Sequence, residues 1–445
     1  MKNSYKWLLV ALLSCAFFFH QADRALFGLL TIPIQDELKL TGGQMGWING
    51  ALFGTLAIMT PIAGFCGDRF SRKWLITGSL IFWSLMTACM GFVGDFRVLG
   101  LVIPAFLSVM FFRSIATGGG ESFYAPSAYA LIATHHKETR SVALSIHQAA
   151  LYIGLMTSGA LVAWILHALK GSAWVERHFG GLGYWRPVFI IFGALGFLLG
   201  VLFIFSLKET TSSGKSIEAK VSPAEKPPLM EGLKAFFCNP SALLATGGFI
   251  AIVVVNNVYM SWAPKFVAEK FAAEYGDKTV AVASAGNGTM LWHHVFAFAA
   301  IMAGGFLTDA FVKRYPRFRL LVQGVALLLG APMLAWFGFA PSLVSTWASV
   351  AAYGVFRGLF EVNTHASLFD VVAPKYRSTA VGLMTMLAFF LGALAPILMG
   401  YLYDARGVRG FEIGFAILGG VYAVGAVLMA LSFFFTFRRD RVVER

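Results

Sequence analysis

Six ionisable side chains interrupt stretches of the sequence that are otherwise apolar. They carry both signs: Asp23, Arg24, Arg113, Glu121, Arg357 and Glu361. If these stretches cross a bilayer, six charges facing lipid would cost on the order of 15–20 kcal/mol, at roughly 2.5–3.5 kcal/mol each. The charges must therefore face a wet cavity or one another. The carboxyl groups could take up protons and a guanidinium could bind an anion, or the set could simply form ion pairs that hold helices together.

Asp23 and Arg24 are neighbours, so on a helix their side chains point about 100° apart. His20 shares the helical stripe of Asp23. One of the two charged side chains can thus face a substrate while the other faces a neighbouring helix. The alternative is that Arg24 is a plain ion-pair partner of Glu121.

Neutral polar side chains lie at membrane depth in further segments. They could bind substrate hydroxyl groups or form hydrogen bonds between helices. The candidates are His147, Gln148, Tyr152, Asn256, Asn257, Tyr259, Asn363 and His365. The neighbouring His293 and His294 diverge on a helix and have no third ligand near in sequence, so we expect no metal. The four cysteines have no paired spacing, and we expect no cofactor.

The composition indicates which elements position these side chains. Of the 445 residues, 58% are hydrophobic and 13% charged, and the mean hydropathy is +0.72. An ordinary soluble domain carries about 25% charge, so a soluble globular protein is excluded. The net charge is +13, but the basic residues sit in short loops between apolar stretches. This pattern indicates membrane orientation and no nucleic-acid partner.

Hydropathy predicts an all-α membrane protein with twelve transmembrane helices. The first apolar run is too long for a signal-peptide core and lacks an evident cleavage site, so we expect it to remain as the first span. Thr41 and Gln44 have the spacing of a capping box at the start of the second helix. The predicted spans are 6–31, 43–66, 74–94, 98–132, 141–167, 185–207, 240–264, 285–308, 319–339, 343–369, 378–402 and 411–437.

A polar stretch rich in Ser, Thr and Pro separates the sixth span from the seventh and is typical of a solvated linker. It predicts an N-terminal half at 1–207, a cytoplasmic linker at 208–232 and a C-terminal half at 233–445. With the N-terminus inside, most of the basic residues lie in cytoplasmic segments. The sequence therefore predicts a multi-pass protein of the cell membrane, the bacterial inner membrane, with both termini in the cytoplasm.

The loop after the second span recurs after the eighth. Gly64, Asp68, Arg72 and Lys73 have the same spacing as Gly305, Asp309, Lys313 and Arg314. This repeat indicates duplication of a six-helix unit. A carboxylate at such a loop can accept from the N-terminus of a neighbouring helix and latch the two halves on the cytoplasmic side. The candidate gating residues are Asp68, Arg69, Arg72, Asp309 and Arg314.

With this loop, its second copy and twelve spans, the sequence resembles the major facilitator superfamily over essentially its whole length. Ser71 stands where the loop motif of that superfamily usually has glycine. The resemblance implies two six-helix halves that transport a substrate by alternating access. Helices 1, 4 and 10, where the membrane charges concentrate, line the central cavity in the resembled fold.

Three pairs of residues narrow the resemblance to two families within the superfamily. Asp23-Arg24, Gly120-Glu121 and Trp185-Arg186 are similar to those of anion:cation symporters of sugar acids, and almost equally to those of the Spinster transporters of lysolipids. The first resemblance implies that Arg24 holds the substrate carboxylate while Asp23 and Glu121 take up protons.

Two features depart from those symporters. Gln21 and Leu26 replace the aromatic and the asparagine that they usually have, which puts a simple hexuronate substrate in doubt. Arg113 and Glu121 are also eight residues apart instead of seven. We expect a kink at the three glycines 118–120, since glycine weakens a helix.

The function expected from the sequence is secondary active transport, as proton-coupled symport of a small organic anion such as a sugar acid. The fifth helix lacks the Gly-Pro pair of antiporters, and no nucleotide-binding, nucleophile or zinc signature supports a pump or an enzyme. The alternative is a Spinster-like transporter of a lysolipid or another amphiphile. A membrane enzyme and a channel are less favoured hypotheses. The expected partners are the anionic substrate, protons and the lipid bilayer, with the protein as a monomer.

Overall fold

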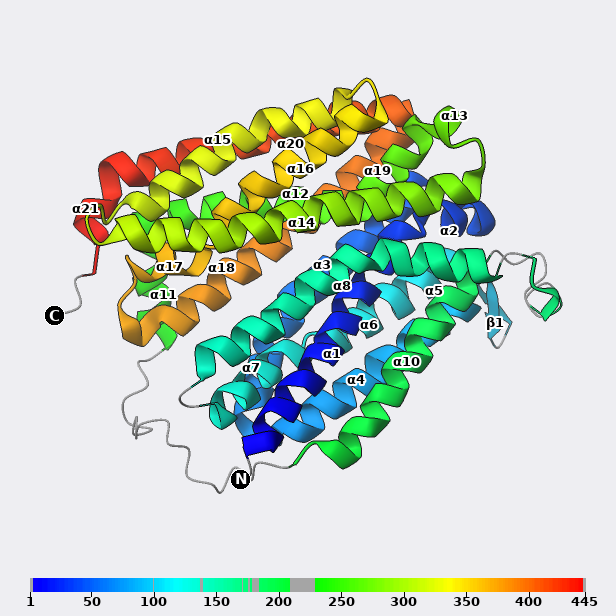
Figure 1. Ribbon diagram of the computed structural model, residues 1–445, viewed down its shortest axis with the longest axis horizontal. Helices are drawn as coiled ribbons and strands as arrows, with labels where there is room; N and C mark the ends of the chain where they lie inside the picture. Colours follow the sequence, from blue (N-terminus) through cyan, green and yellow to red (C-terminus); the bar gives the residue numbers. More distant parts are fainter. Residues whose placement is uncertain are drawn as a thin grey trace. The chain divides into compact units, whose positions relative to one another are not determined.

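The computed structural model describes residues 3–98, 100–136, 139–169, 171–174, 177, 184–208 and 229–442, and within these ranges the chain is almost entirely helical (Figure 1). Within these ranges, ten helices or runs of consecutive helices are long and apolar enough to cross a membrane. They are α1 Asn3–Leu29, α3 Gly42–Arg69, α4 Arg72–Cys89, α8 Arg140–Leu169, α10 Trp185–Ser206, α12 Pro240–Lys270, α14 Lys278–Val312, α15 Phe318–Phe339, α18 Arg377–Gly392 with α19 Leu394–Arg406, and α20 Val408–Leu431 with the π-helix η5 Ser432–Thr436 and α21 Phe437–Asp440.

The other two predicted spans are broken helices. The first consists of α5 Ala105–Val109, the π-helix η2 Met110–Ala116, α6 Thr117–Glu121 and α7 Tyr124–His135, and the second of α16 Leu343–Glu361 and α17 Thr364–Phe369. These two segments carry four of the six membrane charges. Breaks and π-helical turns are tolerated at membrane depth where the backbone is buried in protein. Together with the ten long helices they make the twelve-helix architecture.

The predicted start of the fourth span at residue 98 is wrong. A short antiparallel hairpin of β1 Phe96–Val98 and β2 Leu101–Ile103 precedes it, turning at Gly100, whose φ is +83°. Pro104 follows the hairpin and disfavours the helical conformation in the residue before it, so the helix begins at Ala105.

The three glycines at which a kink was expected lie within α6, and the helix breaks just after them, at residues 122–123, before α7 begins. A Cβ atom at Gly118 would lie 2.8 Å from the Leu52 side chain, and one at Gly120 would lie 2.9 Å from the Phe82 ring. These two glycines therefore allow close approach of α3 and α4 to the broken helix.

The capping box at the start of α3 is confirmed. The Thr41 hydroxyl accepts from the amide of Gln44 at 3.1 Å, and the Gln44 carboxamide oxygen accepts from the amide of Thr41 at 2.9 Å.

Short elements complete the described chain. They are α2 Thr31–Leu38, the 3₁₀ helix η1 Met90–Phe92, α11 Leu229–Phe237, α13 Ala272–Tyr275 and the 3₁₀ helix η4 Pro374–Tyr376. Residues 209–228 of the predicted linker lie outside the described residues.

The chain forms two compact units. Unit 1 comprises Met1–Gly214, Val258–Leu291 and Pro396–Ala405, and unit 2 comprises Lys215–Asn257, Trp292–Ala395 and Arg406–Arg445. In unit 1, α1 packs on α8 and α4 on α10 around a core that includes Leu13, Phe17, Trp83 and Phe203. In unit 2, α15 packs against α16 and α20. The division into two sequence halves remains a prediction.

Candidate functional site

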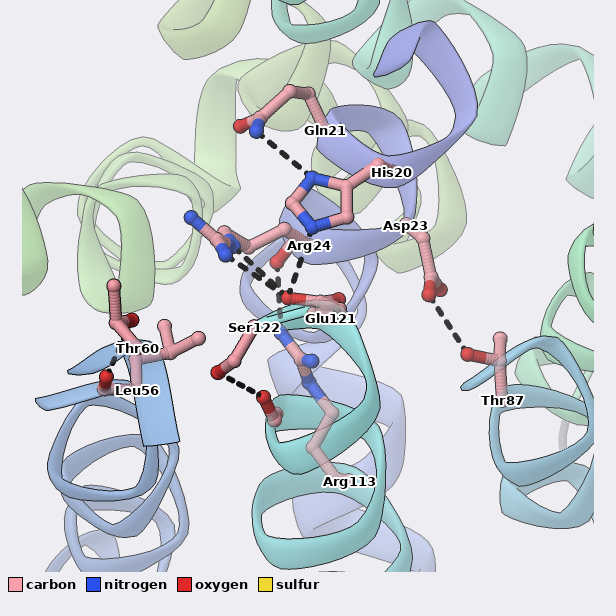
Figure 2. Close-up of polar contacts among 11 residues, drawn as sticks. His20, Gln21, Asp23, Arg24, Leu56, Thr60, Thr87, Arg113, Glu121 and Ser122 are labelled. Atoms are coloured by element: carbon pink, nitrogen blue, oxygen red, sulfur yellow. Dashed lines mark hydrogen bonds and ion pairs between the residues drawn. The ribbon is translucent and has the colours of Figure 1, made fainter. Parts of the chain in front are cut away.

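An ion pair between α1 and α6 forms the centre of the candidate site in unit 1. Arg24 donates from Nε at 3.2 Å and from Nη2 at 3.0 Å, both to Oε2 of Glu121 (Figure 2). The Glu121 side chain is fully buried, whereas 22% of the Arg24 side chain is exposed. The two residues predicted to bind substrate and proton therefore contact each other. Arg24 is also the partly accessible member of the pair.

His20 lies on the same face of α1, one turn before Arg24. Its Nδ1 accepts from the Gln21 carboxamide nitrogen at 2.9 Å, so the neutral ring carries its proton on Nε2. That Nε2 lies 3.7 Å from Oε2 of Glu121. The imidazole therefore lies beside the Glu121 carboxylate without a hydrogen bond to it.

Asp23 points away from this pair, toward α4, as Figure 2 shows. The Thr87 hydroxyl donates to its Oδ2 at 2.7 Å, and the residue is buried. Among the described residues, Asp23 takes part in no ion pair. The divergence of Asp23 and Arg24 expected from helical geometry is therefore present, and Asp23 faces a neighbouring helix.

Arg113 is buried below the pair and is anchored by the backbone. Its Nη2 donates to the carbonyl oxygen of Arg24 at 2.8 Å, and its guanidinium carbon lies 5.8 Å from the centre of the Phe27 ring. Arg113 thus ties the broken helix to α1 at the residue that pairs with Glu121.

Tyr124, Tyr129 and residues of α8 extend the polar region. The Tyr129 hydroxyl donates to Gln148 at 2.9 Å, and the Tyr124 hydroxyl lies 3.3 Å from Nε2 of His147. The buried His147 ring stacks on Phe17, with ring centres 4.4 Å apart. These contacts fit the interhelical hydrogen bonding that was the alternative interpretation of these polar residues.

The other predicted substrate residues lie in varied surroundings. Tyr152 and Tyr259 are buried in unit 1, and the Tyr259 hydroxyl donates to the carbonyl oxygen of Thr289 at 2.8 Å. The remaining three belong to unit 2: Asn256 is half-buried, Asn363 donates to the Thr308 hydroxyl at 3.2 Å, and His365 is exposed.

The predicted gating residues are only partly described. Arg72 donates from Nη1 to the Thr134 hydroxyl at 3.0 Å, which joins the start of α4 to the end of α7. Asp309 and Arg314 are exposed at the end of α14 and just beyond it. The side chains of Asp68 and Arg69 lie outside the described residues.

A carboxylate bound to a helix N-terminus does occur in unit 1, at a residue that the sequence did not single out. Oδ1 of Asp404 accepts from the amide of Gly42, and its Oδ2 accepts from the amide of Gly43, each at 2.6 Å. These amides begin α3, so the carboxylate satisfies donors that have no intrahelical partner. Lys278 forms an ion pair with Asp36 in the same unit. The contact between Asp404 and Gly42 joins residues 362 positions apart, so no local sequence pattern reveals it.

Unit 2 contains a second charge cluster, in which the charged side chains are half-buried. Arg357 pairs with Glu361 at 3.2 Å, and its Nη1 lies 3.1 Å from Nε2 of His293. Since a guanidinium cannot accept, His293 accepts through Nε2. The His293 ring stacks on Tyr353 with 4.7 Å between ring centres. The sequence identified the charges but not the participation of His293.

Charge clusters at membrane depth in a bundle of spanning helices are typical of membrane transporters, and the comparison with known families agrees. The chain belongs to the Major Facilitator Superfamily, whose family model matches residues 12–392 and 295–444. Its members are transporters, not enzymes.

Two curated relatives illustrate the similarity. The hexuronate transporter of Bacillus subtilis (strain 168) is 24% identical over 422 residues, covering 92% of this chain and 90% of the relative. Protein spinster of Drosophila melanogaster is 23% identical over 411 residues, covering 90% of this chain and 62% of the relative. The chain therefore spans less than two thirds of the length of the latter protein.

Solved structures share the fold. A bacterial homolog of the human lysosomal transporter Spinster, in an inward-facing and occupied conformation, has a TM-score of 0.81 and 19% identity, with all of both chains covered. The D-xylose–proton symporter has a TM-score of 0.69 and 16% identity, covering 96% of this chain and 97% of the other.

Proposed function

We propose that the protein imports a small organic anion, such as a sugar acid, together with protons. The observation that carries the proposal is the pairing of Arg24 with Glu121. Both donor groups of the guanidinium that bind Glu121 use a single oxygen, and the Arg24 side chain is partly exposed. Arg24 is thus a cation that an incoming carboxylate can reach, provided that it displaces Glu121.

Competition between Glu121 and the substrate carboxylate for Arg24 can couple substrate binding to protonation of Glu121. An ionised Glu121 holds Arg24, whereas a protonated Glu121 has no charge with which to do so. A carboxylate substrate and a proton on Glu121 therefore favour each other's binding. The adjacent His20 Nε2 can donate to whichever carboxylate is present.

Asp23 is the second proton site in this proposal. Its buried carboxylate has a hydroxyl donor but no ion-pair partner among the described residues. A bound proton would remove an uncompensated charge from a region of low dielectric constant. Because Thr87 lies on α4, loss or gain of that proton would alter the contact between α1 and α4.

Hydroxyl groups of the substrate require neutral partners. The proposed set is His20, Gln148, Tyr152, Asn256, Tyr259, Asn363 and His365, of which His20, Gln148, Tyr259 and Asn363 already make hydrogen bonds within their own units. The name of the hexuronate transporter, and that of a probable galactarate/D-glucarate transporter with 23% identity, support a sugar acid as substrate.

Gating in this proposal uses carboxylates at helix ends. Asp68 would act at the end of α3 and Asp309 at the end of α14. The candidate basic partners are Arg69, Arg72 and Arg314. Asp404 would latch the opposite end of α3 through the amides of Gly42 and Gly43. Alternating access then requires that one latch opens as the other forms. We place the protein in the bacterial inner membrane with cytoplasmic termini.

The competing proposal is a Spinster-like transporter of a lysolipid or another amphiphile. Protein spinster is about as similar to this chain as the hexuronate transporter is. An amphiphile with an anionic headgroup could use the same Arg24.

A thermal-shift screen of the purified protein separates the two proposals, because a ligand that binds the folded state stabilises it. Sugar acids should raise the melting temperature of the wild type and leave that of Arg24→Ala unchanged. Stabilisation by lysophospholipids, with none by sugar acids, would replace the symport proposal with the Spinster-like one.

A further inference from the structure

An apolar groove of about 560 Å³ lies on unit 1, between α3, α4 and the broken helix that carries Glu121. Its rim is formed by exposed large side chains: Trp74, Phe82, Phe111 and Ile115. Trp74 and Phe82 lie on α4, which is long and apolar enough to cross a membrane, and exposed apolar side chains on such a helix indicate that the groove opens toward hydrocarbon. Its expected occupant is therefore a lipid chain.

The floor of the groove includes two glycines that packing does not explain. A Cβ atom at Gly78 or at Gly119 would meet no heavy atom within 4 Å. In contrast, Gly118 and Gly120, on either side of Gly119, would collide with Leu52 and Phe82. The absence of a side chain at Gly78 and Gly119 thus leaves the groove deep and does not serve helix contact.

Along α4 the groove is somewhat shorter than the hydrocarbon thickness of one leaflet. Trp74 and Phe82 line it on α4, and eight residues of helix span about 12 Å. The hydrocarbon core of a bilayer is about 30 Å thick. The groove therefore accepts one segment of an acyl chain from the leaflet at the N-terminal end of α4.

A cation lies at the mouth of the groove. The Lys73 ammonium is 5.2 Å from the centre of the Trp74 ring, and within the described part of the chain it makes no ion pair and no hydrogen bond. The neighbouring Arg72 is engaged with Thr134. Tryptophan and lysine side by side at a helix end are typical of the membrane interface, where a basic residue attracts anionic headgroups.

We propose that this groove is a binding site for an anionic diacyl phospholipid, with one acyl chain over Gly78 and Gly119 and the phosphate at Lys73. The site is independent of the proposed transport substrate. Its inner wall is the segment that carries Glu121, two residues after Gly119. A bound chain therefore fills the space beside that segment and supports its π-helical geometry.

Quenching of tryptophan fluorescence in nanodiscs tests the proposal. The probes are phosphatidylglycerol and phosphatidylcholine with brominated acyl chains, and the contribution of Trp74 is the difference between wild type and Trp74→Phe. Brominated phosphatidylglycerol should quench Trp74 at an about fivefold lower mole fraction than phosphatidylcholine, the factor expected for one basic residue at a lipid headgroup. Lys73→Gln should abolish this preference.

Gly119→Leu fills the groove and should reduce quenching of Trp74 by either lipid at least severalfold. Gly78→Leu, on α4, gives a second measurement if the first variant does not fold. Gly420→Leu is the matched control, because Gly420 is exposed on a membrane helix of unit 2 and a Cβ there also meets nothing within 4 Å.

Three results would overturn the proposal. Equal quenching by both lipids would refute the role of Lys73. Unchanged quenching in both leucine variants would refute the groove as the site of the chain. Efficient cross-linking of two copies through a cysteine at Phe111 in nanodiscs would make the groove a protein interface.

Discussion

Substitution Glu121→Gln tests the competition for Arg24. The glutamine keeps the shape of the side chain but cannot form the ion pair, so a substrate carboxylate no longer displaces a charge. Hydrogen bonds to charged groups contribute about 1.5–3 kcal/mol, and here two donors share one acceptor oxygen at 3.0 and 3.2 Å. Partial exposure of Arg24 weakens the pair. We expect the variant to bind a sugar acid roughly 10- to 100-fold more tightly at pH 8.

The competition for Arg24 also predicts how substrate affinity changes with pH. In the wild type, protonation of Glu121 releases Arg24, so affinity should fall as the pH rises. In Glu121→Gln that slope should largely disappear. The variant should also lose uphill accumulation driven by a pH gradient while retaining exchange of substrate, since it mimics a protonated carrier that can still bind and change state.

Isothermal titration of purified protein at pH 5.5 and pH 8 measures the affinities, and counterflow in proteoliposomes measures exchange. Glu412→Gln is the control, since Glu412 pairs at 2.6 Å with Arg409, which is 62% exposed. If Glu121→Gln binds with the affinity and the pH dependence of the wild type, Glu121 is structural and the reasoning fails.

The other predictions concern Arg24, Asp23, Gly118 and Asp404. Arg24→Lys should weaken binding at least about tenfold by titration, because an ammonium cannot reproduce the guanidinium geometry; wild-type affinity would show that the charge alone suffices. Asp23→Asn should abolish pH-driven accumulation in proteoliposomes but leave counterflow, and normal accumulation would exclude Asp23 from coupling. Gly118→Val should lower the free energy of unfolding by about 1–3 kcal/mol through overpacking, measured by denaturant titration, whereas an unchanged midpoint would contradict the tight contact. Asp404→Asn should slow transport more than it weakens binding, and spin labels at positions 44 and 405 should move apart; unchanged distances and rates would exclude a latch there.

Local features of the sequence predicted much of the fold. The capping box depends on two residues three positions apart, and the long helices depend on continuous hydropathy, so both can be read along the chain. The hairpin before Ala105 could not, because five of its six strand residues are apolar and continue the hydropathy of the helix. The conformation of Gly100 and the position of Pro104 interrupt the helix where hydropathy does not.

The sequence predicted which charged residues belong to the candidate site, but not all of their contacts. Helical geometry correctly separated the directions of Asp23 and Arg24, but it could not show that Arg113 binds a backbone carbonyl oxygen. The Asp404 contact escaped prediction for a related reason. A latch of a carboxylate on helix amides was expected at Asp68, yet the described example joins residues distant in sequence at the other end of α3.

The most direct test of the account measures proton movement with substrate in proteoliposomes that start without a pH gradient. Adding a sugar acid such as glucuronate outside should acidify the lumen, as reported by trapped pyranine, in liposomes with wild-type protein. The signal should be absent with Glu121→Gln, although labelled substrate still exchanges. Uptake of the sugar acid by the wild type without any change in luminal pH would contradict proton-coupled symport.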